Sequence, residues 1–219
     1  VDSLLSAVPM PATFREQYAQ TVPFSFHGVD RQGHPIFILR FGSVEVAAFR
    51  KLWAEGERLG AGLGANAVVL LYIRSMEYAT RVLMQRESTR QGRVVDRMLS
   101  ILDLSGAGIS HVTDSSLKAF LGQASRESVT LYPETLHASV VAFAPWLFCK
   151  AAWPLARRFA HPVTQSKLRL LSSDDVRKGL LELVEEEQLP PYLGGRCSCE
   201  ECTLGKLRGG SLWAWDNEA

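Results

Sequence analysis

The chain has 219 residues, enough to bury one substantial core, and 47% of them are hydrophobic. Its 24 basic and 23 acidic residues give a formal net charge of +1. This balance excludes an overall basic field that would attract nucleic acid, and it excludes a long acidic tail.

Strand and helix patterns alternate along the chain. The turn residues Asp30 and Gly33 precede a run of strand-forming side chains, and Thr113 or Asp114 can cap the start of a helix. Strands are expected over 36–41, 94–106, 136–144 and after a turn that begins at 161, and helices over 44–59, 67–90, 113–131 and 172–188, with a glycine-rich connector over 59–66. Such alternation is typical of an α/β fold with a mainly parallel sheet and helices packed against it.

Residues 140–156 form a long apolar stretch in which Lys150 is the only charge. A core helix, a membrane span and a flap over a ligand would each explain it. A span needs about 20 apolar residues, and this stretch is shorter and contains Pro145 and Pro154. We therefore do not expect it to cross a membrane.

A helix over 145–159 would carry its basic residues on one narrow face and apolar residues over the rest of its surface. Pro154 removes a backbone hydrogen bond, so the helix should kink or break near its middle. A helix with two apolar sides and a weak point suits a gate that covers a ligand and contacts a bilayer, and a core helix bent by proline is the alternative. The candidate gate and pocket residues are Trp146, Phe148, Trp153, Leu155 and Phe159.

Five separated motifs occur in one order along the chain: DRQGHP, ILDLSG, LYPETLHASVVAFAPWLF, HPVTQSK and LPPYLGG. Together they resemble the CRAL-TRIO lipid-binding domain family, of the phosphatidylinositol/phosphatidylcholine transfer type. The resemblance covers residues 15–195. It leaves residues 1–14 as an N-terminal remnant and residues 196–219 as a C-terminal extension that contains cysteine and tryptophan.

The resemblance implies a mostly parallel sheet as the floor of an apolar pocket, with surrounding helices and a mobile gate helix. It also implies non-enzymatic binding of a phospholipid, above all phosphatidylinositol, and its transfer between membranes. A lipid-sensing or membrane-targeting module of a larger protein is the alternative function. A carrier of another hydrophobic ligand, such as a sterol or a tocopherol-like molecule, is a further one.

The resemblance further implies that Glu134, Thr164 and Lys167 hold the inositol-phosphate head group. Lys167 can meet a phosphate as a point charge, and Thr164 offers a hydroxyl. A structural ion pair between Glu134 and Lys167, unrelated to a ligand, is the alternative. Ser100 matches a hydroxyl position on the phosphatidylcholine side, but Met98 replaces its hydroxyl-bearing neighbour, which leaves phosphatidylcholine binding open.

The partners that we expect are therefore a phospholipid and, transiently, a membrane surface, with no cofactor beyond the bound lipid. The chain has no Gly-x-Ser-x-Gly nucleophile motif, and no pair of carboxylates is placed for acid–base catalysis. We therefore expect no enzymatic activity.

Three cysteines are crowded in the motif CSCEEC, as Cys197, Cys199 and Cys202. A structural zinc site needs four ligands, and no further cysteine or histidine lies near them in the sequence. We therefore expect surface thiols and no metal site. Crowded rather than dispersed cysteines also favour a reducing, cytoplasmic compartment. The resemblance implies peripheral association with a membrane. Because the chain starts at Val1 and the start has no signal-peptide pattern, we expect a fragment or processed product.

Overall fold

The computed structural model describes residues 10–62, 64–145, 166–199 and 202. Within them one sheet has the strand order β1-β2-β3-β4-β5. The strands are β1 (Phe24–Val29), β2 (Pro35–Leu39), β3 (Met98–Asp103), β4 (Leu136–Ala142) and β5 (Leu168–Leu170). β1 pairs with β2 in the antiparallel direction, and the other neighbours pair in parallel. The mostly parallel sheet that the sequence predicts is confirmed.

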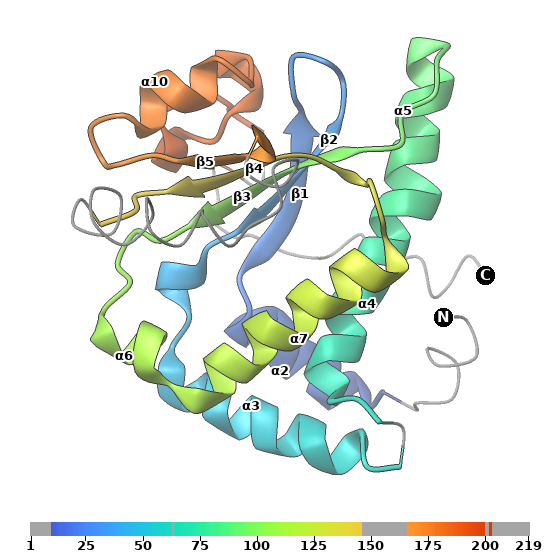
Figure 1. Ribbon diagram of the computed structural model, residues 1–219, viewed down its shortest axis with the longest axis vertical. Coiled ribbons are helices and arrows are strands. Elements are labelled where there is room, and N and C mark those ends of the chain that lie inside the picture. Colours follow the sequence, from blue (N-terminus) through green and yellow to red (C-terminus); the bar gives the residue numbers. More distant parts are fainter. Residues whose placement is uncertain (1–9, 63, 146–165, 200–201, 203–219) are drawn as a thin grey trace.

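Helices cover both faces of the sheet, and most of them lie on one side. They are α2 (Ala12–Thr21), α3 (Val46–Leu59), α4 (Ala67–Tyr78), α5 (Met84–Gln91), α6 (Ile109–Thr113), α7 (Ser115–Leu131) and α10 (Val176–Leu181). In Figure 1, α2, α3, α4 and α7 lie below the sheet, and α10 lies above it. Short 3-10 turns cover Phe41–Ser43, Glu186–Gln188 and Pro191–Leu193. A π-helical turn over Ala79–Leu83 joins α4 to α5, which confirms the expected long helix.

Side-chain caps fix where two of these helices begin. Asp114 accepts a hydrogen bond from the backbone N–H of Leu117 at 2.9 Å and therefore caps α7. Arg50 on α3 donates to the second oxygen of Asp114 at 2.5 Å, which ties the two helices together. Asn66 caps α4 through the N–H of Val68 at 2.9 Å. Of the two residues that the sequence offered as the cap of α7, Asp114 is the one used.

Helix α10 is much shorter than the helix expected over 172–188. The reason is a long-range contact with the turn between β1 and β2. The backbone N–H of Arg31 donates to the carbonyl of Leu183 at 2.8 Å, and its side chain donates to the carbonyl of Leu181 at 3.0 Å. The chain then continues in turns that bury Val184 and Leu189 completely. Burial against the sheet overrides the helical pattern of the sequence.

Each face of the sheet has its own apolar cluster, because alternate side chains along a strand point to opposite faces. On the face toward α3, α4 and α7 the cluster includes Phe24, Phe37, Leu39 and Met98. On the face toward α10 it includes Ile36, Ile38, Leu99, Ile101, Val140, Leu180 and Leu193. The sheet is therefore sandwiched, and its parallel strands are apolar on both sides, as such strands usually are.

The turn between β1 and β2 is built around the buried carboxylate of Asp30. One oxygen accepts from the backbone N–H groups of Gln32 and His34, at 2.8 and 2.9 Å. The other oxygen lies 2.9 Å from Nδ1 of His34 and 3.9 Å from Nε2 of His137. The two imidazole rings stack with their centroids 4.2 Å apart. The turn that Asp30 and Gly33 predict is confirmed, and it also holds the start of β4.

The C-terminal end of α7 is fixed by a buried hydrogen bond to α4. The hydroxyl of Tyr132 donates to Oε1 of Glu77 at 2.7 Å. The other carboxylate oxygen of Glu77 lies 2.5 Å from Nε of Arg81, and Glu77 is almost wholly buried. This arrangement holds the turn that leads into β4.

No helix within the described residues is both long and apolar enough to cross a bilayer. Most of the stretch weighed as a membrane span, residues 146–156, lies outside the described residues.

The Tyr132→Phe variant should lose about 1.5–3 kcal/mol of unfolding free energy, because it removes a hydrogen bond to a charged, buried carboxylate. Urea denaturation measures the loss. The control is Tyr72→Phe, which removes a neutral hydrogen bond to Ser128 at 2.7 Å and should lose only about 0.5–1.5 kcal/mol. Equal losses in the two variants would contradict a charged partner for Tyr132.

The stability of the fold should decrease as the pH falls below the ordinary range of histidine. Burial lowers the pKa of His137 from its ordinary value of 6.5, and the neighbouring His34 lowers it further. The unfolded chain therefore binds a proton more readily than the folded chain. The contribution of His137 is complete above the unfolded pKa and is lost as the pH falls toward the folded pKa. In urea denaturation between pH 7.5 and 5, His137→Gln should show a shallower loss of stability than the parent chain. Parallel curves would disprove this assignment.

Candidate functional site

Lys167 and Glu134 form an ion pair at one edge of the sheet. Nζ of Lys167 donates to Oε2 of Glu134 at 3.2 Å. Glu134 lies just before β4 and Lys167 just before β5, and these two strands are parallel neighbours. Their amino ends therefore meet at the same edge. The side chain of Lys167 is only 18% exposed, whereas that of Glu134 is 73% exposed, so the carboxylate is the member of the pair that is open to solvent.

The backbone at Glu134 adopts an unusual conformation, with φ of +65° in the left-handed region. Only glycine and, less often, asparagine visit this region readily. The turn is closed by the hydroxyl of Thr135, which donates to the carbonyl of Tyr132 at 2.9 Å. It is tied to β3 because the N–H of Met98 donates to the carbonyl of Thr135 at 2.8 Å. Backbone strain of this kind is concentrated at functional sites.

Charges of both signs lie close to the pair, because the carboxylate of Asp30 is 3.9 Å from Nε2 of His137. Burial is the main reason that the pKa of His137 is lowered, and the charges of Arg97 and Lys167 also contribute. Nε of Arg97 lies 3.7 Å from Oδ1 of Asp96, and Lys167 forms its ion pair with Glu134. His137 is the residue at which the pairing of β4 with β3 shifts register, and such bulges redirect side chains next to functional sites. Lys167 is the cation of the pair that could meet an anionic group such as a phosphate.

Two hydroxyl groups lie side by side on the sheet. Ser100 of β3 is paired directly with Ser139 of β4, and both are half-buried. Ser100 also lies beside Phe37 of β2, so both serines are on the face covered by α3, α4 and α7. Among the described residues, no hydrogen bond or ion pair joins Ser100 to Lys167 or Glu134. Sequence analysis missed Ser139, although its position between the buried Ala138 and Val140 was a signal for this face.

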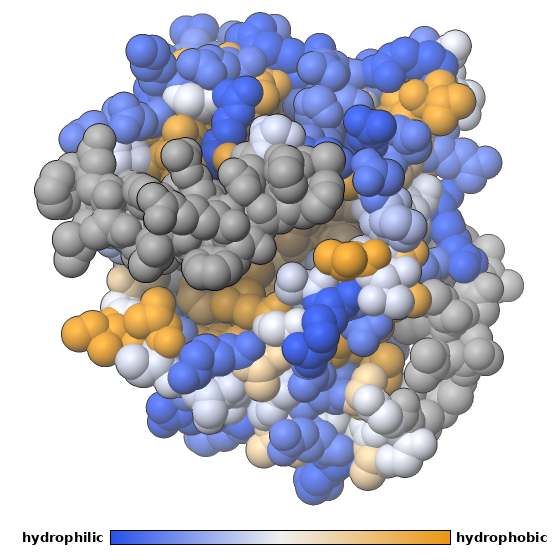
Figure 2. Space-filling model, viewed as in Figure 1, coloured by the Kyte–Doolittle hydropathy of each residue, from blue (hydrophilic) through white to orange (hydrophobic). Residues whose placement is uncertain are grey.

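The same face of the sheet borders a hollow. Figure 2 shows it across the middle of the molecule, with apolar side chains in its floor. Half-buried apolar residues, among them Phe26, Leu102 and Tyr72, pack against the cluster on this face. An apolar hollow with a few polar groups is the usual form of a site for a small hydrophobic ligand.

Six of the residues predicted from the sequence lie outside the described residues, and their roles stay predictions. They are Thr164 of the head-group set and the gate residues Trp146, Phe148, Trp153, Leu155 and Phe159.

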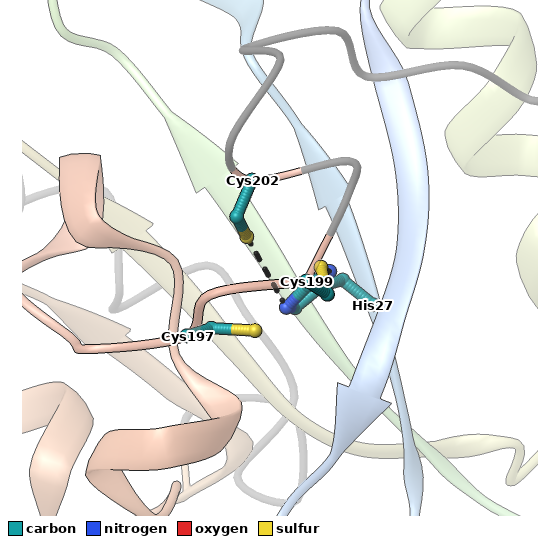
Figure 3. A group of neighbouring side chains, drawn as sticks. All are labelled: His27, Cys197, Cys199 and Cys202. Carbon is teal, nitrogen blue, oxygen red and sulfur yellow. Dashed lines mark hydrogen bonds between the residues drawn. The ribbon is translucent and has the colours of Figure 1, made fainter.

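The three clustered cysteines have a neighbour that sequence spacing did not reveal. Figure 3 shows the side chain of His27, from β1, directed toward Cys197, Cys199 and Cys202. Sγ of Cys202 lies 3.6 Å from Nε2 of His27, and Sγ of Cys199 lies 4.0 Å from Nδ1. The fourth candidate ligand that was missing from the sequence neighbourhood is therefore supplied by the fold.

Known proteins resemble this chain in both sequence and fold. The chain is 28% identical over 184 residues to "Phosphatidylinositol/phosphatidylcholine transfer protein SFH13" of Arabidopsis thaliana, a match that covers 84% of this chain and 28% of that protein. It is 26% identical over 189 residues to "Sec14 cytosolic factor" of Schizosaccharomyces pombe, covering 84% of this chain and 60% of the relative. The chain thus spans less than a third of the Arabidopsis protein.

The crystal structure of Sfh5 superimposes with a TM-score of 0.60 at 17% identity, covering 98% of this chain and 71% of the other, and shows a shared fold. Residues 19–195 match the CRAL/TRIO domain. This match covers most of the sheet, the helices on both of its faces and the Glu134–Lys167 pair. The chain therefore belongs to the CRAL/TRIO domain family.

Proposed function

We propose that this chain binds one phospholipid, with phosphatidylinositol as the favoured lipid, and carries it between membranes without altering it chemically. The observation that carries the proposal is the Lys167–Glu134 pair, held by a strained turn where β4 and β5 begin. Relatives from Arabidopsis thaliana are named phosphatidylinositol/phosphatidylcholine transfer proteins, which supports the same function.

The head group would bind at the edge where β4 and β5 begin. The side chain of Lys167 is mostly buried, and in such surroundings its charge would attract a phosphate oxygen more strongly than in water. Glu134 is exposed and can accept hydrogen bonds from the hydroxyls of inositol. A sugar-like head group with a phosphate uses both the cation and the carboxylate. Phosphocholine has a phosphate and a quaternary ammonium but no hydroxyl, so it offers Glu134 no hydrogen-bond donor.

The acyl chains would lie against the sheet face that borders the hollow. Phe26 and Leu102 are half-buried there and pack against the buried cluster of this face. Each CH₂ group removed from water contributes about 0.8 kcal/mol, so two acyl chains would provide most of the affinity. Ser100 and Ser139 are polar groups on this face that could meet the ester region.

Contact with the membrane would occur at the opposite end of the sheet from the head group, where the parallel strands end. Helix α6 follows the end of β3, and the stretch that contains the predicted gate begins after β4. Ile109 and Val112 on α6 are 80% and 65% exposed, and apolar residues lie beside the hollow in that part of Figure 2. Exposed apolar side chains beside a pocket suit transient insertion into a bilayer surface.

The lipid preference is tested by incubating the purified chain with mixed vesicles and identifying the extracted lipids by mass spectrometry. The parent chain should retain phosphatidylinositol in near-stoichiometric amounts. The Lys167→Ala variant should retain at least about tenfold less phosphatidylinositol, because a hydrogen bond to a charged group contributes about 1.5–3 kcal/mol. Lys178→Ala, which removes an exposed lysine of α10, is the matched control and should bind like the parent chain.

The outcomes separate the alternatives. If a well-folded Lys167→Ala variant retains phosphatidylinositol fully, the head-group site is wrong. A sterol or a prenyl lipid in the parent chain would contradict the phospholipid assignment while keeping the apolar hollow. If the parent chain retains no lipid at all, the proposal that it carries a lipid is wrong, and the alternative of a membrane-targeting module is favoured.

The double variant Ile109→Gln and Val112→Gln should bind vesicles roughly tenfold more weakly, because it removes apolar area that would be buried in the bilayer. Transfer of a fluorescent phospholipid between vesicles should slow in parallel. The matched control changes Val94 and Val129 to Gln, since these residues are 77% and 74% exposed and lie near the amino ends of the strands. An equal effect of the two double variants would show that α6 has no special part in membrane contact.

A further inference from the structure

We propose that His27, Cys197, Cys199 and Cys202 form a structural zinc site that fastens the C-terminal segment to the edge of the sheet. The ligand atoms of all four residues lie within 4.8 Å of one another. Figure 3 shows the four side chains converging on one point from two separate parts of the chain. This site is distinct from the lipid hollow and from the Lys167–Glu134 pair.

The first argument is the fit between these distances and tetrahedral zinc. With zinc–sulfur bonds of about 2.3 Å and a zinc–nitrogen bond of about 2.0 Å, sulfur atoms are about 3.8 Å apart and sulfur and nitrogen about 3.6 Å. Sγ of Cys202 is already 3.6 Å from Nε2 of His27. The remaining separations need to contract by about 1 Å at most, which rotation of cysteine side chains can provide.

The second argument is the type and number of the ligands. Three thiolates and one imidazole form one of the closed ligand sets of structural zinc sites. The set leaves no position for water, so the site would stabilise the fold rather than catalyse a reaction. Thiolate ligands also disfavour calcium and magnesium, which prefer oxygen.

The third argument is that the backbone holds the ligands in place before a metal binds. His27 is 6% exposed and belongs to β1, where it directly follows Phe26, which pairs with Phe37 of β2. The N–H of Cys197 donates to the carbonyl of Leu189 at 3.1 Å. A side chain at position 195 would place its Cβ 1.9 Å from that same carbonyl oxygen, so Gly195 is required for the bend that brings the cysteines to β1.

The position of the site explains what zinc would do. β1 is an edge strand, and exposed edges are prone to pair with other chains. A metal that joins β1 to residues 197–202 would cover part of this edge. It would also close a loop of about 170 residues, a constraint on the unfolded chain like that of a disulfide.

The test measures metal bound to the 219-residue chain purified under reducing conditions. One zinc ion per chain is expected by elemental mass spectrometry. Replacement of zinc by Co²⁺ should give the intense visible absorption of a tetrahedral site and a sulfur-to-cobalt charge-transfer band. Removal of zinc with a strong chelator should lower the Tm. Zinc at less than a tenth of the chain concentration after saturation and desalting would overturn the proposal.

Variants identify the ligands. His27→Ala and Cys199→Ser should each lose stoichiometric zinc and the tetrahedral cobalt spectrum, while His27→Cys should retain both as a four-cysteine site. Cys149→Ser, which removes the remaining cysteine of the chain, is the matched control and should bind like the parent. Because His27→Ala could unfold the strand, circular dichroism accompanies each variant, and His27→Cys gives an independent result. A His27→Cys variant that shows no shift of the cobalt charge-transfer band toward a four-thiolate spectrum would overturn the role of His27.

Discussion

The parallel pairing of β2, β3, β4 and β5 is the constraint on which the rest of the structure depends. It places the amino ends of these strands at one edge of the sheet and their carboxyl ends at the other. Each strand contributes alternate side chains to two apolar clusters. The helices that connect the strands must therefore return across the sheet. The charged turns lie where the strands begin, and α6 and the stretch after β4 lie where the strands end.

The charged residues at the end of the sheet where β4 and β5 begin lie in turns with a strained backbone or beside a shift in strand register. Glu134 is held in a left-handed conformation, and His137 lies where the register of β4 shifts. Asp30 joins the turn before β2 to the start of β4 through His137, whose Nε2 lies 3.9 Å from Oδ2 of Asp30. Burial of His137 lowers its pKa. This burial and the backbone strain at Glu134 both reduce the free energy of unfolding. Such costs are typical of residues retained for binding rather than for folding.

The antiparallel strand β1 carries His27 of the proposed zinc site, which is separate from the proposed lipid site. Because β1 lies at the edge, its residue His27 faces the segment that follows the last 3-10 turn. The cysteines reach it only because the chain bends at the glycines 194 and 195. Lipid binding and metal binding would thus use opposite parts of one sheet, and each can be tested without disturbing the other.

Local patterns in the sequence indicated strands β2 to β5, the main helices and a cap at Thr113 or Asp114, because propensity and apolar periodicity act over neighbouring residues. The motifs and their resemblance also indicated that Glu134 and Lys167 belong to one site. Only the tertiary structure decided that α10 ends early against Arg31, that Ser139 faces Ser100, and that His27 meets cysteines 172 and 175 residues away. These features depend on strand register and on contacts between distant segments. No local window of the sequence contains both partners, so the sequence alone offered no physical signal that they meet.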